Sequence, residues 1–362
     1  MFKKILLLAM VLILGLLTVA PVQAAGNIKV LSTSAEVSFP QSITFKISAQ
    51  DDVNIKELRL QYSIQMASFA QVVNEAFVQI QPSTKVDTQW QWDLTKIGGL
   101  PPGTVITYQW LLKDDSGNTF QTPSAEVKFD DGRYSWNTLT QDKVTLFWYN
   151  GDQSFGQELM QATQDALTRL SGSTGATIKD PIRLYIYANA TDLQGSMIFA
   201  QDWSGGVAFP PYGCIAIGIS ASNIDWGKSA IAHELTHLII HQMTMNPYND
   251  LPTWLDEGLA MYNQGPLDST FTDSLNQAIS QKKLLSVRTL CSPFSAYATT
   301  SYISYAESYY IVDYLITTYG KDKMFALLDA FKQGSTYDGA LQKVYGFDMD
   351  GLNTIWQAIL KK

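Results

Sequence analysis

Apolar and polar residues alternate along several short segments in the first third of the chain. The clearest examples are residues 37–39, 43–47, 58–62 and 90–92. A period of two places the side chains of a strand on opposite faces, one buried and one exposed. Turn residues separate the segments, and they cluster at 51–52, 98–103 and 114–118. The pattern predicts an antiparallel β-sandwich over residues 27–131.

This spacing of strands and turns resembles immunoglobulin and fibronectin type III domains. Trp90 and Trp92 could form a carbohydrate platform, but they share one strand face, which favours a place in the core. The Asp-rich turn at 114–118 lacks the ligand spacing of an EF-hand and indicates a hairpin turn. The segment shows no chemistry of its own, which leaves a cell-surface or polymeric ligand open as its partner.

The pattern changes after a polar linker at residues 130–133. We expect strands at 144–149, 182–187 and 214–219, and a helix at 153–170. Gly205-Gly206 and Pro210-Pro211 bracket a loop before the last strand. From Pro252 onwards the period is helical, with helices at 304–319, 321–332, 336–345 and 349–361. The sequence therefore predicts a second, α+β domain over residues 134–362 with a helical C-terminal half.

Residues 1–24 have the features of a signal peptide. Lys3 and Lys4 precede an apolar run from Ile5 to Ala20, and Val22-Gln23-Ala24 is a small-residue cleavage site. The alternative is an uncleaved membrane anchor, but Gly15 interrupts the run, which is short. No later stretch is long and apolar enough to span a bilayer. We expect an exported protein, secreted or held at the cell surface, with no stable membrane span after cleavage.

The net charge limits the classes of partner, and the cysteine content limits the number of disulfide bridges. The whole chain has a net charge of −8, which repels phosphate backbones and argues against a nucleic-acid partner. Cys214 and Cys291 are the only cysteines. In an oxidising compartment they could form one disulfide bridge, and two separate buried thiols are the alternative. A bridge would tie the strand at 214–219 to the segment before the helix at 304–319.

The strongest chemical signal is H-E-x-x-H at residues 233–237. In a helix, His233 and His237 lie on one face, roughly 6 Å apart along the axis. Two imidazoles so placed can bind one zinc ion, and Glu234 can then act as a base towards water. The flanking residues are mostly apolar, as expected for a buried helix, and all three histidines of the chain lie between residues 233 and 241.

A catalytic zinc ion needs a third protein ligand. His241 lies eight residues from His233, roughly 12 Å along a helix, which is too far. Pro252 suits the first turn of a new helix that would bring Glu257 back towards the histidines. H-E-x-x-H followed by W-L-x-E-G at 254–258 resembles the gluzincin metallopeptidases, including the aminopeptidase N type. The resemblance implies His233, His237 and Glu257 as ligands of one zinc ion and Glu234 as general base, on an α+β zincin-type (thermolysin-like) fold.

A second motif of the same family lies further along the chain. Ile303-Ser304-Tyr305 resembles the aminopeptidase N stretch that supplies an oxyanion-stabilising tyrosine, which implies a catalytic role for Tyr305. Tyr302 and Tyr309 are the alternatives. The aminopeptidases also carry G-x-M-E-N on an edge strand, whose glutamate binds the substrate's free amino group. This chain has no acid at 205–212, and it most closely resembles the peptidase-MA-like domains of exported bacterial proteins.

Three functions follow from these motifs. The first is a secreted zinc metallopeptidase, an endopeptidase, that acts on peptides or proteins. The second is an exported binding or adhesion protein whose peptidase-like domain is weakly active or inactive. The third is a structural zinc site. The binding protein is disfavoured because a scaffold has no need for four polar groups in an apolar setting. The structural zinc site is disfavoured by Glu234, because a closed site needs no base beside its ligands.

Overall fold

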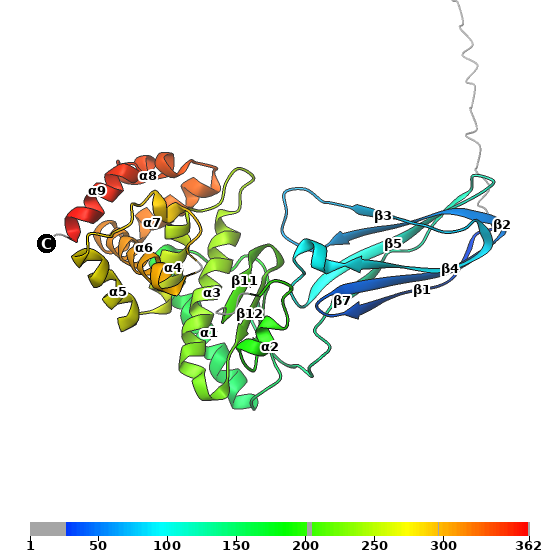
Figure 1. Cartoon of the computed structure of the whole chain (residues 1–362), viewed down its shortest axis with the longest axis horizontal. Helices are drawn as coiled ribbons and strands as arrows, with labels where there is room; N and C mark the ends of the chain where they lie inside the picture. The colour runs from blue at the N-terminus through cyan, green and yellow to red at the C-terminus, as the bar shows by residue number, and fades with distance from the viewer. Residues whose placement is uncertain (1–26, 201–204, 296, 361–362) are drawn as a thin grey trace, which may run out of the picture.

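The structure is a computed structural model that describes residues 27–200, 205–295 and 297–360. The expected signal peptide at 1–24 lies outside the described residues. Figure 1 shows a β-rich unit beside a larger unit of helices and strands. The first unit ends with strand β7 at Phe129, and the second begins with strand β8 at Asn137. Within the described residues, no helix is long and apolar enough to cross a membrane.

The first unit is built from seven antiparallel strands around one core. They are β1 (Lys29–Ser38), β2 (Ser42–Ile64), β3 (Asn74–Val78), β4 (Ser83–Asp93), β5 (Thr104–Asp114), β6 (Thr119–Gln121) and β7 (Ala125–Phe129). The N-terminal part of β2 pairs with β1 and β4, and its C-terminal part pairs with β3 and β5. Strand β2 therefore belongs to both layers of the sandwich, which confirms the predicted fold. Trp92 is buried in the core, and Trp90 packs against it.

One detail of the strand prediction was wrong. The sequence places a turn at residues 51–52, whereas β2 continues through them to Ile64. A register shift between Gln50 and Ile55 takes the place of the turn. The strand stays extended there because its two ends pair with different partner strands.

A mixed sheet of five strands begins the second unit, in the order β11-β12-β10-β9-β8. The strands are β8 (Asn137–Gln141), β9 (Val144–Trp148), β10 (Ile182–Tyr187), β11 (Gly206–Phe209) and β12 (Cys214–Gly218). Strand β10 runs parallel to β9 and β12, while β8 and β11 are antiparallel edge strands. The segment that the sequence indicates as a loop thus contains β11, because its backbone pairs with β12.

Most helices of the second unit pack on one face of this sheet and extend beyond it, while the short helix α2 packs on the other face. The helices are α1 (Gln153–Thr174), α2 (Ala190–Gln194), α3 (Ile224–Thr244), α4 (Thr253–Gln264), α5 (Ser269–Ser280), α6 (Ala298–Tyr319), α7 (Lys321–Lys332), α8 (Tyr337–Tyr345) and α9 (Met349–Ile359). The apolar faces of α1, α3, α4 and α6 to α9 form one large core with the sheet. The helical C-terminal half agrees with the prediction, although α6 begins earlier than the expected residue 304.

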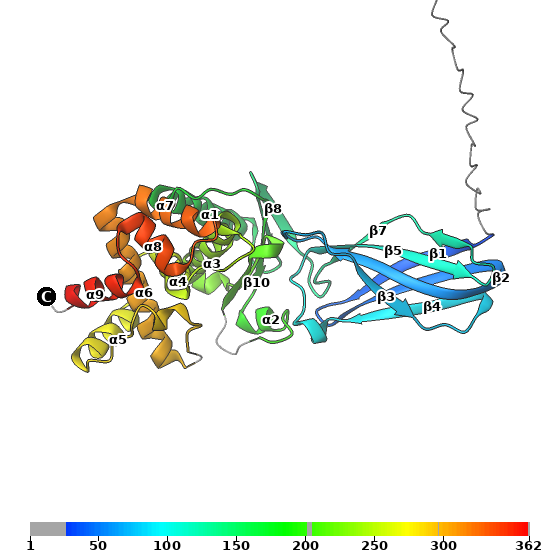
Figure 2. The same cartoon turned by 90° about the horizontal axis from the view of Figure 1, so that it is seen from above.

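The two units meet through hydrogen bonds and a buried acid. In Figures 1 and 2 the sheet lies between the helices and the sandwich. Arg183 of β10 donates to the carbonyl oxygens of Gly103 and Tyr212. Asp131, which is fully buried, accepts hydrogen bonds from Arg133 and from the Tyr187 hydroxyl. The bond to Gly103 joins the sandwich to the sheet, and the bond to Asp131 joins the linker to the sheet.

The two cysteines are free thiols, so of the two alternatives the structure has the separate thiols and not the disulfide bridge. Alternate side chains of β12 point to opposite faces of the sheet. Cys214 lies on the face that packs towards the sandwich, and its Sγ is 3.6 Å from the carbonyl oxygen of Pro102. Cys291 lies among the helices, with its Sγ 3.8 Å from Met349 Sδ. The sheet therefore separates the two thiols.

Candidate metal centre and active site

Helix α3 carries the H-E-x-x-H motif and is held in place by its apolar residues. Leu235, Leu238 and Ile239 are buried in the large core. With these side chains turned inward, His233 and His237 lie one turn apart on the opposite, partly open side of the helix. Their rings are 4.9 Å apart, centroid to centroid. The helical spacing of the motif thus places the histidines as the sequence predicts.

Helix α4 brings the second motif to the same place. Trp254 and Leu255 are fully buried and anchor its first turn. Gly258 lets α4 approach α6, because a Cβ atom there would be 2.5 Å from the backbone oxygen of Ser308. This close packing places Asp256 and Glu257 opposite the two histidines.

Three side chains converge to form a cluster that could bind a metal ion. The Nε2 atoms of His233 and His237 are 3.2 Å apart, and Glu257 Oε2 lies 3.5 and 3.4 Å from them. Ligands at about 2.0–2.1 Å from a tetrahedral ion would be roughly 3.3–3.4 Å apart. Glu257 Oε2 is buried and has no hydrogen-bond donor. The spacing and this unpartnered oxygen both fit a metal ion between the three atoms.

Two neighbours orient the histidines. Asp256 Oδ1 lies 2.9 Å from His237 Nδ1, and Gln264 Oε1 lies 3.1 Å from His233 Nδ1. An acceptor at Nδ1 favours the tautomer whose Nε2 is free to bind a metal ion. Neither orienting residue was predicted from the sequence. The only available signal was that each lies on the helix that carries Glu257.

His241 lies outside the cluster. Its Nε2 is 3.1 Å from the other carboxylate oxygen of Asp256, so one carboxylate contacts both His237 and His241. Burial lowers the pKa of His241, but the hydrogen bond and charge of Asp256 outweigh burial and raise the pKa above its ordinary value. His241 is therefore placed to support Asp256, and the structure does not bring it to the three converging atoms.

Glu234 and Tyr305 line the same pocket as the cluster. This active-site pocket has a volume of about 540 Å³, and its walls come from α3, α4, α6 and β11. Burial raises the pKa of Glu234, and the positive charge of the two histidines partly offsets that effect. On its other side Glu234 faces Gly206 of β11, where a Cβ atom would be 3.0 Å from Glu234 Oε1.

Among the three candidate tyrosines, the structure brings Tyr305 to the site. Burial and the charges of Glu257, Glu234 and Asp256 raise the pKa of the Tyr305 hydroxyl. Tyr302 instead packs against Phe271, with ring centroids 5.2 Å apart. Tyr309 packs against Tyr310 at 5.1 Å.

The residues of this site lie within a region shared with a known family. The family model described as "Peptidase MA superfamily" matches residues 162–362, which is more than half of the chain. The chain belongs to the peptidase MA superfamily. This match includes the metal cluster, Glu234 and Tyr305, and it confirms the resemblance of the motifs to peptidase-MA-like domains.

Several solved structures resemble this peptidase MA protein at low sequence identity. Aminopeptidase A from Legionella pneumophila is 12% identical with a TM-score of 0.40, over 91% of this chain and 50% of that one. The M1 zinc metallopeptidase from Deinococcus radiodurans is 11% identical with a TM-score of 0.39, over 92% of this chain and 95% of that one. OgpA from Akkermansia muciniphila is 10% identical with a TM-score of 0.24, over 30% and 28%. The chain therefore covers half or less of the Legionella and Akkermansia proteins. A comparison with curated proteins gives no match.

Proposed function

We propose that this protein is an exported zinc metallopeptidase that cleaves peptide bonds within a polypeptide. The observation that carries the proposal is the convergence of the His233, His237 and Glu257 ligand atoms beside Glu234 and Tyr305. Two histidines and one carboxylate are a typical ligand set of catalytic zinc, which keeps one position open. Export rests on the sequence of residues 1–24 alone.

The metal and the side chains have separate tasks. Zinc in this site would supply Lewis acidity, which lowers the pKa of water towards neutrality and polarises a carbonyl group. Glu234 is not one of the three converging ligands, so its carboxylate is available as a base. It accepts a proton from the attacking water and delivers that proton to the leaving amine.

Tyr305 is placed to stabilise the oxygen of the scissile carbonyl. Its hydroxyl faces the pocket from α6, across from α3, and its raised pKa keeps it protonated and able to donate a hydrogen bond. Such donors act on the negative charge that develops in the transition state. Tyr305 is therefore proposed as the oxyanion donor.

Replacing Tyr305 with phenylalanine removes this donor and keeps the ring. We expect kcat to fall on the order of 10²-fold, with a smaller change in KM, because the hydrogen bond strengthens only in the transition state. Steady-state kinetics on one peptide would measure this. The matched control is Tyr302→Phe, whose ring packs on Phe271. An equal loss in both variants, or a change confined to KM, would argue against the assignment.

The shape of the cleft supports cleavage within a chain. Strand β11 is an edge strand, so an extended substrate could pair along its outer edge. On one side of the active-site pocket lies a second pocket of about 270 Å³, lined partly by Trp226 and Phe271. On the other side lies a third, between the two units. The catalytic groups thus lie part-way along a groove.

No uncommitted carboxylate for a substrate amino group is found among the described residues of the pocket. The acids that line it there are Glu234, Asp256 and Glu257. Glu257 is a proposed ligand, Asp256 contacts two histidines, and Glu234 is the proposed base. An aminopeptidase would need a further acid to recognise a chain end.

The proposal is tested by comparing matched peptides with free and acetylated N-termini. We expect both to be cut at internal bonds with kcat/KM values within about threefold, because no described acid is available for the free amine. Mass spectrometry identifies the products. Release of single residues only from free N-termini would contradict the endopeptidase assignment. The proposed metal site would stand in that case.

A further inference from the structure

The loop between β2 and β3 carries an unusual set of exposed apolar side chains. In this loop, residues 65–73, Phe69 is 59% exposed and Val72 is 61% exposed. Met66 and Val73 are exposed as well. Apolar side chains that gather on a surface mark interaction sites more often than scattered ones do. The loop thus has the character of a binding surface.

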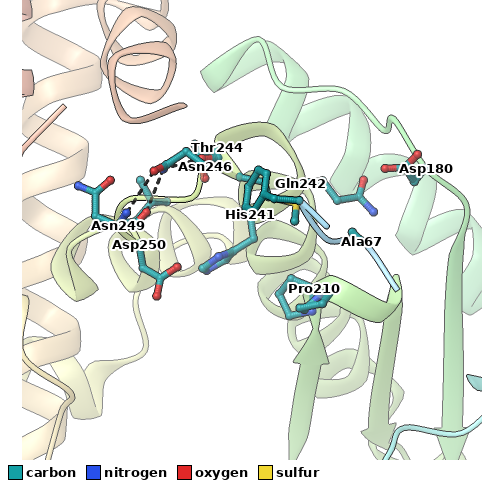
Figure 3. A pocket seen from close by; sticks show the side chains of 13 residues that line it. Ala67, Asp180, Pro210, His241, Gln242, Thr244, Asn246, Asn249 and Asp250 are labelled. Carbon is teal, nitrogen blue, oxygen red and sulfur yellow. Dashed lines mark hydrogen bonds between the residues drawn. The ribbon is translucent and has the colours of Figure 1, made fainter. Parts of the chain in front are cut away.

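This apolar loop lies against the peptidase unit. The backbone N–H of Ala67 donates to the carbonyl oxygen of Pro211 at 2.7 Å. Ala67 and Phe69 form part of the wall of a pocket of about 370 Å³. The remaining wall comes from the end of α3, from residues 245–251 and from the Pro210 region, as Figure 3 shows. We call this the interdomain pocket, and its size falls within the range of about 300–1,000 Å³ usual for ligand sites.

The interdomain pocket adjoins the active-site pocket. His241 and Pro210 line both of them. Pro210 directly follows β11, so a substrate that extends along β11 is directed towards this pocket. His241 lies four residues beyond His237 and eight beyond His233, or roughly 6–12 Å along α3. An extended peptide covers this distance with about two to four residues.

The chemistry of the interdomain pocket favours an apolar side chain. Its apolar wall residues are Ala67, Phe69, Pro210, Pro211, Met245 and Leu251. Two of the polar side chains beside them already use their donors, while Gln242 also lines the pocket. Asn246 Nδ2 donates to backbone carbonyls, one of them that of Phe331 at 3.0 Å, and the Thr244 hydroxyl donates to Ile240.

Apart from His241, whose Nε2 contacts Asp256, the ionisable groups that line this pocket are acidic. Asp180 and Asp250 are exposed, and they lie on opposite sides of the pocket in Figure 3. A substrate carboxylate there would meet the two like charges of Asp180 and Asp250. The pocket should therefore reject Asp and Glu.

We propose that the interdomain pocket binds an apolar side chain of an extended polypeptide substrate, two to four residues from the bond that is cut. Phe69 of the sandwich determines this preference, so the sandwich takes part in substrate recognition. This proposal rests on the proposed peptidase function, and it names the substrate class of the same groove.

The test compares the full-length wild type with Phe69→Ala and Phe77→Ala. Phe77 is a matched control, because it is 64% exposed on β3 of the same sandwich and does not line the pocket. Each protein digests one peptide library from denatured proteins, and mass spectrometry maps the cuts. For the wild type and Phe77→Ala we expect enrichment of Leu, Ile, Met and Phe, and depletion of Asp and Glu, at one position about two to four residues from the cut.

Phe69→Ala should lose this enrichment and keep the preferences next to the cut. For a peptide with Leu at that position, its kcat/KM should fall about 10-fold. A peptide too short to reach the pocket should be cut equally by all three proteins. Loss of activity on both peptides together with a lower melting temperature would show misfolding. In that case Phe69→Leu, which keeps an apolar side chain, should restore the long-peptide activity if the proposal is correct.

Failure of the inference can be told apart from failure of the proposed function. If the wild type cuts short peptides but shows no preference at that position, or prefers Lys and Arg there, the inference is overturned and the peptidase function stands. If the wild type cuts nothing, binding of a fluorescent apolar decapeptide to the Glu234→Gln protein, with and without Phe69→Ala, replaces the digest. Equal affinity of the two would overturn the inference.

Discussion

Replacing Glu234 with glutamine is expected to lower peptide hydrolysis about 10²–10⁴-fold while the metal stays bound. Glutamine keeps the shape of the side chain and removes its ability to accept a proton. A loss of activity in this variant can be assigned to loss of the base, because Glu234 is not one of the three residues whose ligand atoms converge. Neighbouring side chains should keep their places, since Gly206 leaves room for either side chain.

The measurement has two parts. Activity is followed on a fluorogenic peptide near neutral pH, and zinc is measured by elemental analysis of the same preparation. Activity of the wild type should also disappear in the presence of a chelator and return with zinc. Full activity of Glu234→Gln with normal zinc content would contradict the assignment of the base.

Removing a ligand should have the largest effect on the metal. We expect His233→Ala, His237→Ala and Glu257→Ala each to lose most of the bound zinc and nearly all activity, because two protein ligands hold the ion far more weakly than three. His241→Ala should keep most of the zinc. The zinc affinity of Asp256→Ala should lie between that of His241→Ala and those of the three ligand variants. We expect it to be about 10–100-fold below that of the wild type, because Asp256 orients His237.

Isothermal titration of the metal-free proteins with zinc would rank these variants. Circular dichroism of each metal-free protein shows whether it is folded. If His241 proved essential for binding and Glu257 dispensable, the ligand set proposed here would be wrong.

The fold could be predicted from the sequence where the relevant pattern is local. Alternation identifies the sandwich strands, and helical spacing alone is enough to place His233 and His237 on one face of α3. Glu257 required a resemblance to a known family, because nothing within α4 reveals that it turns towards α3. Glu257 lies close to His233 and His237 because of the position of α4, which packs closely against α6 at Gly258.

The parts of the site that could not be predicted from the sequence all depend on long-range packing. Asp256 and Gln264 have no periodic signature as orienting residues, since their roles depend on where α4 crosses α3. The sequence could not decide between a disulfide bridge and two thiols, because only the packing shows that Cys214 and Cys291 lie on opposite sides of the sheet. Phe69 lies in a different unit from the catalytic motif, and no local pattern distinguishes it from any other loop residue.

The hydrogen bonds that join the sandwich and the linker to the sheet have a consequence for where this protein would cut. Arg183 bonds the sheet to Gly103 of the sandwich, and Tyr187 bonds it to Asp131 of the linker, so the structure places Phe69 at one defined position relative to the catalytic groups. If the interdomain pocket holds one substrate side chain, the distance from that pocket to the catalytic groups sets the position of the cut. Each cut would then fall a set number of residues from the bound side chain. Fragments from a flexible substrate would then have a regular offset from its apolar residues, whatever the sequence at the cut itself.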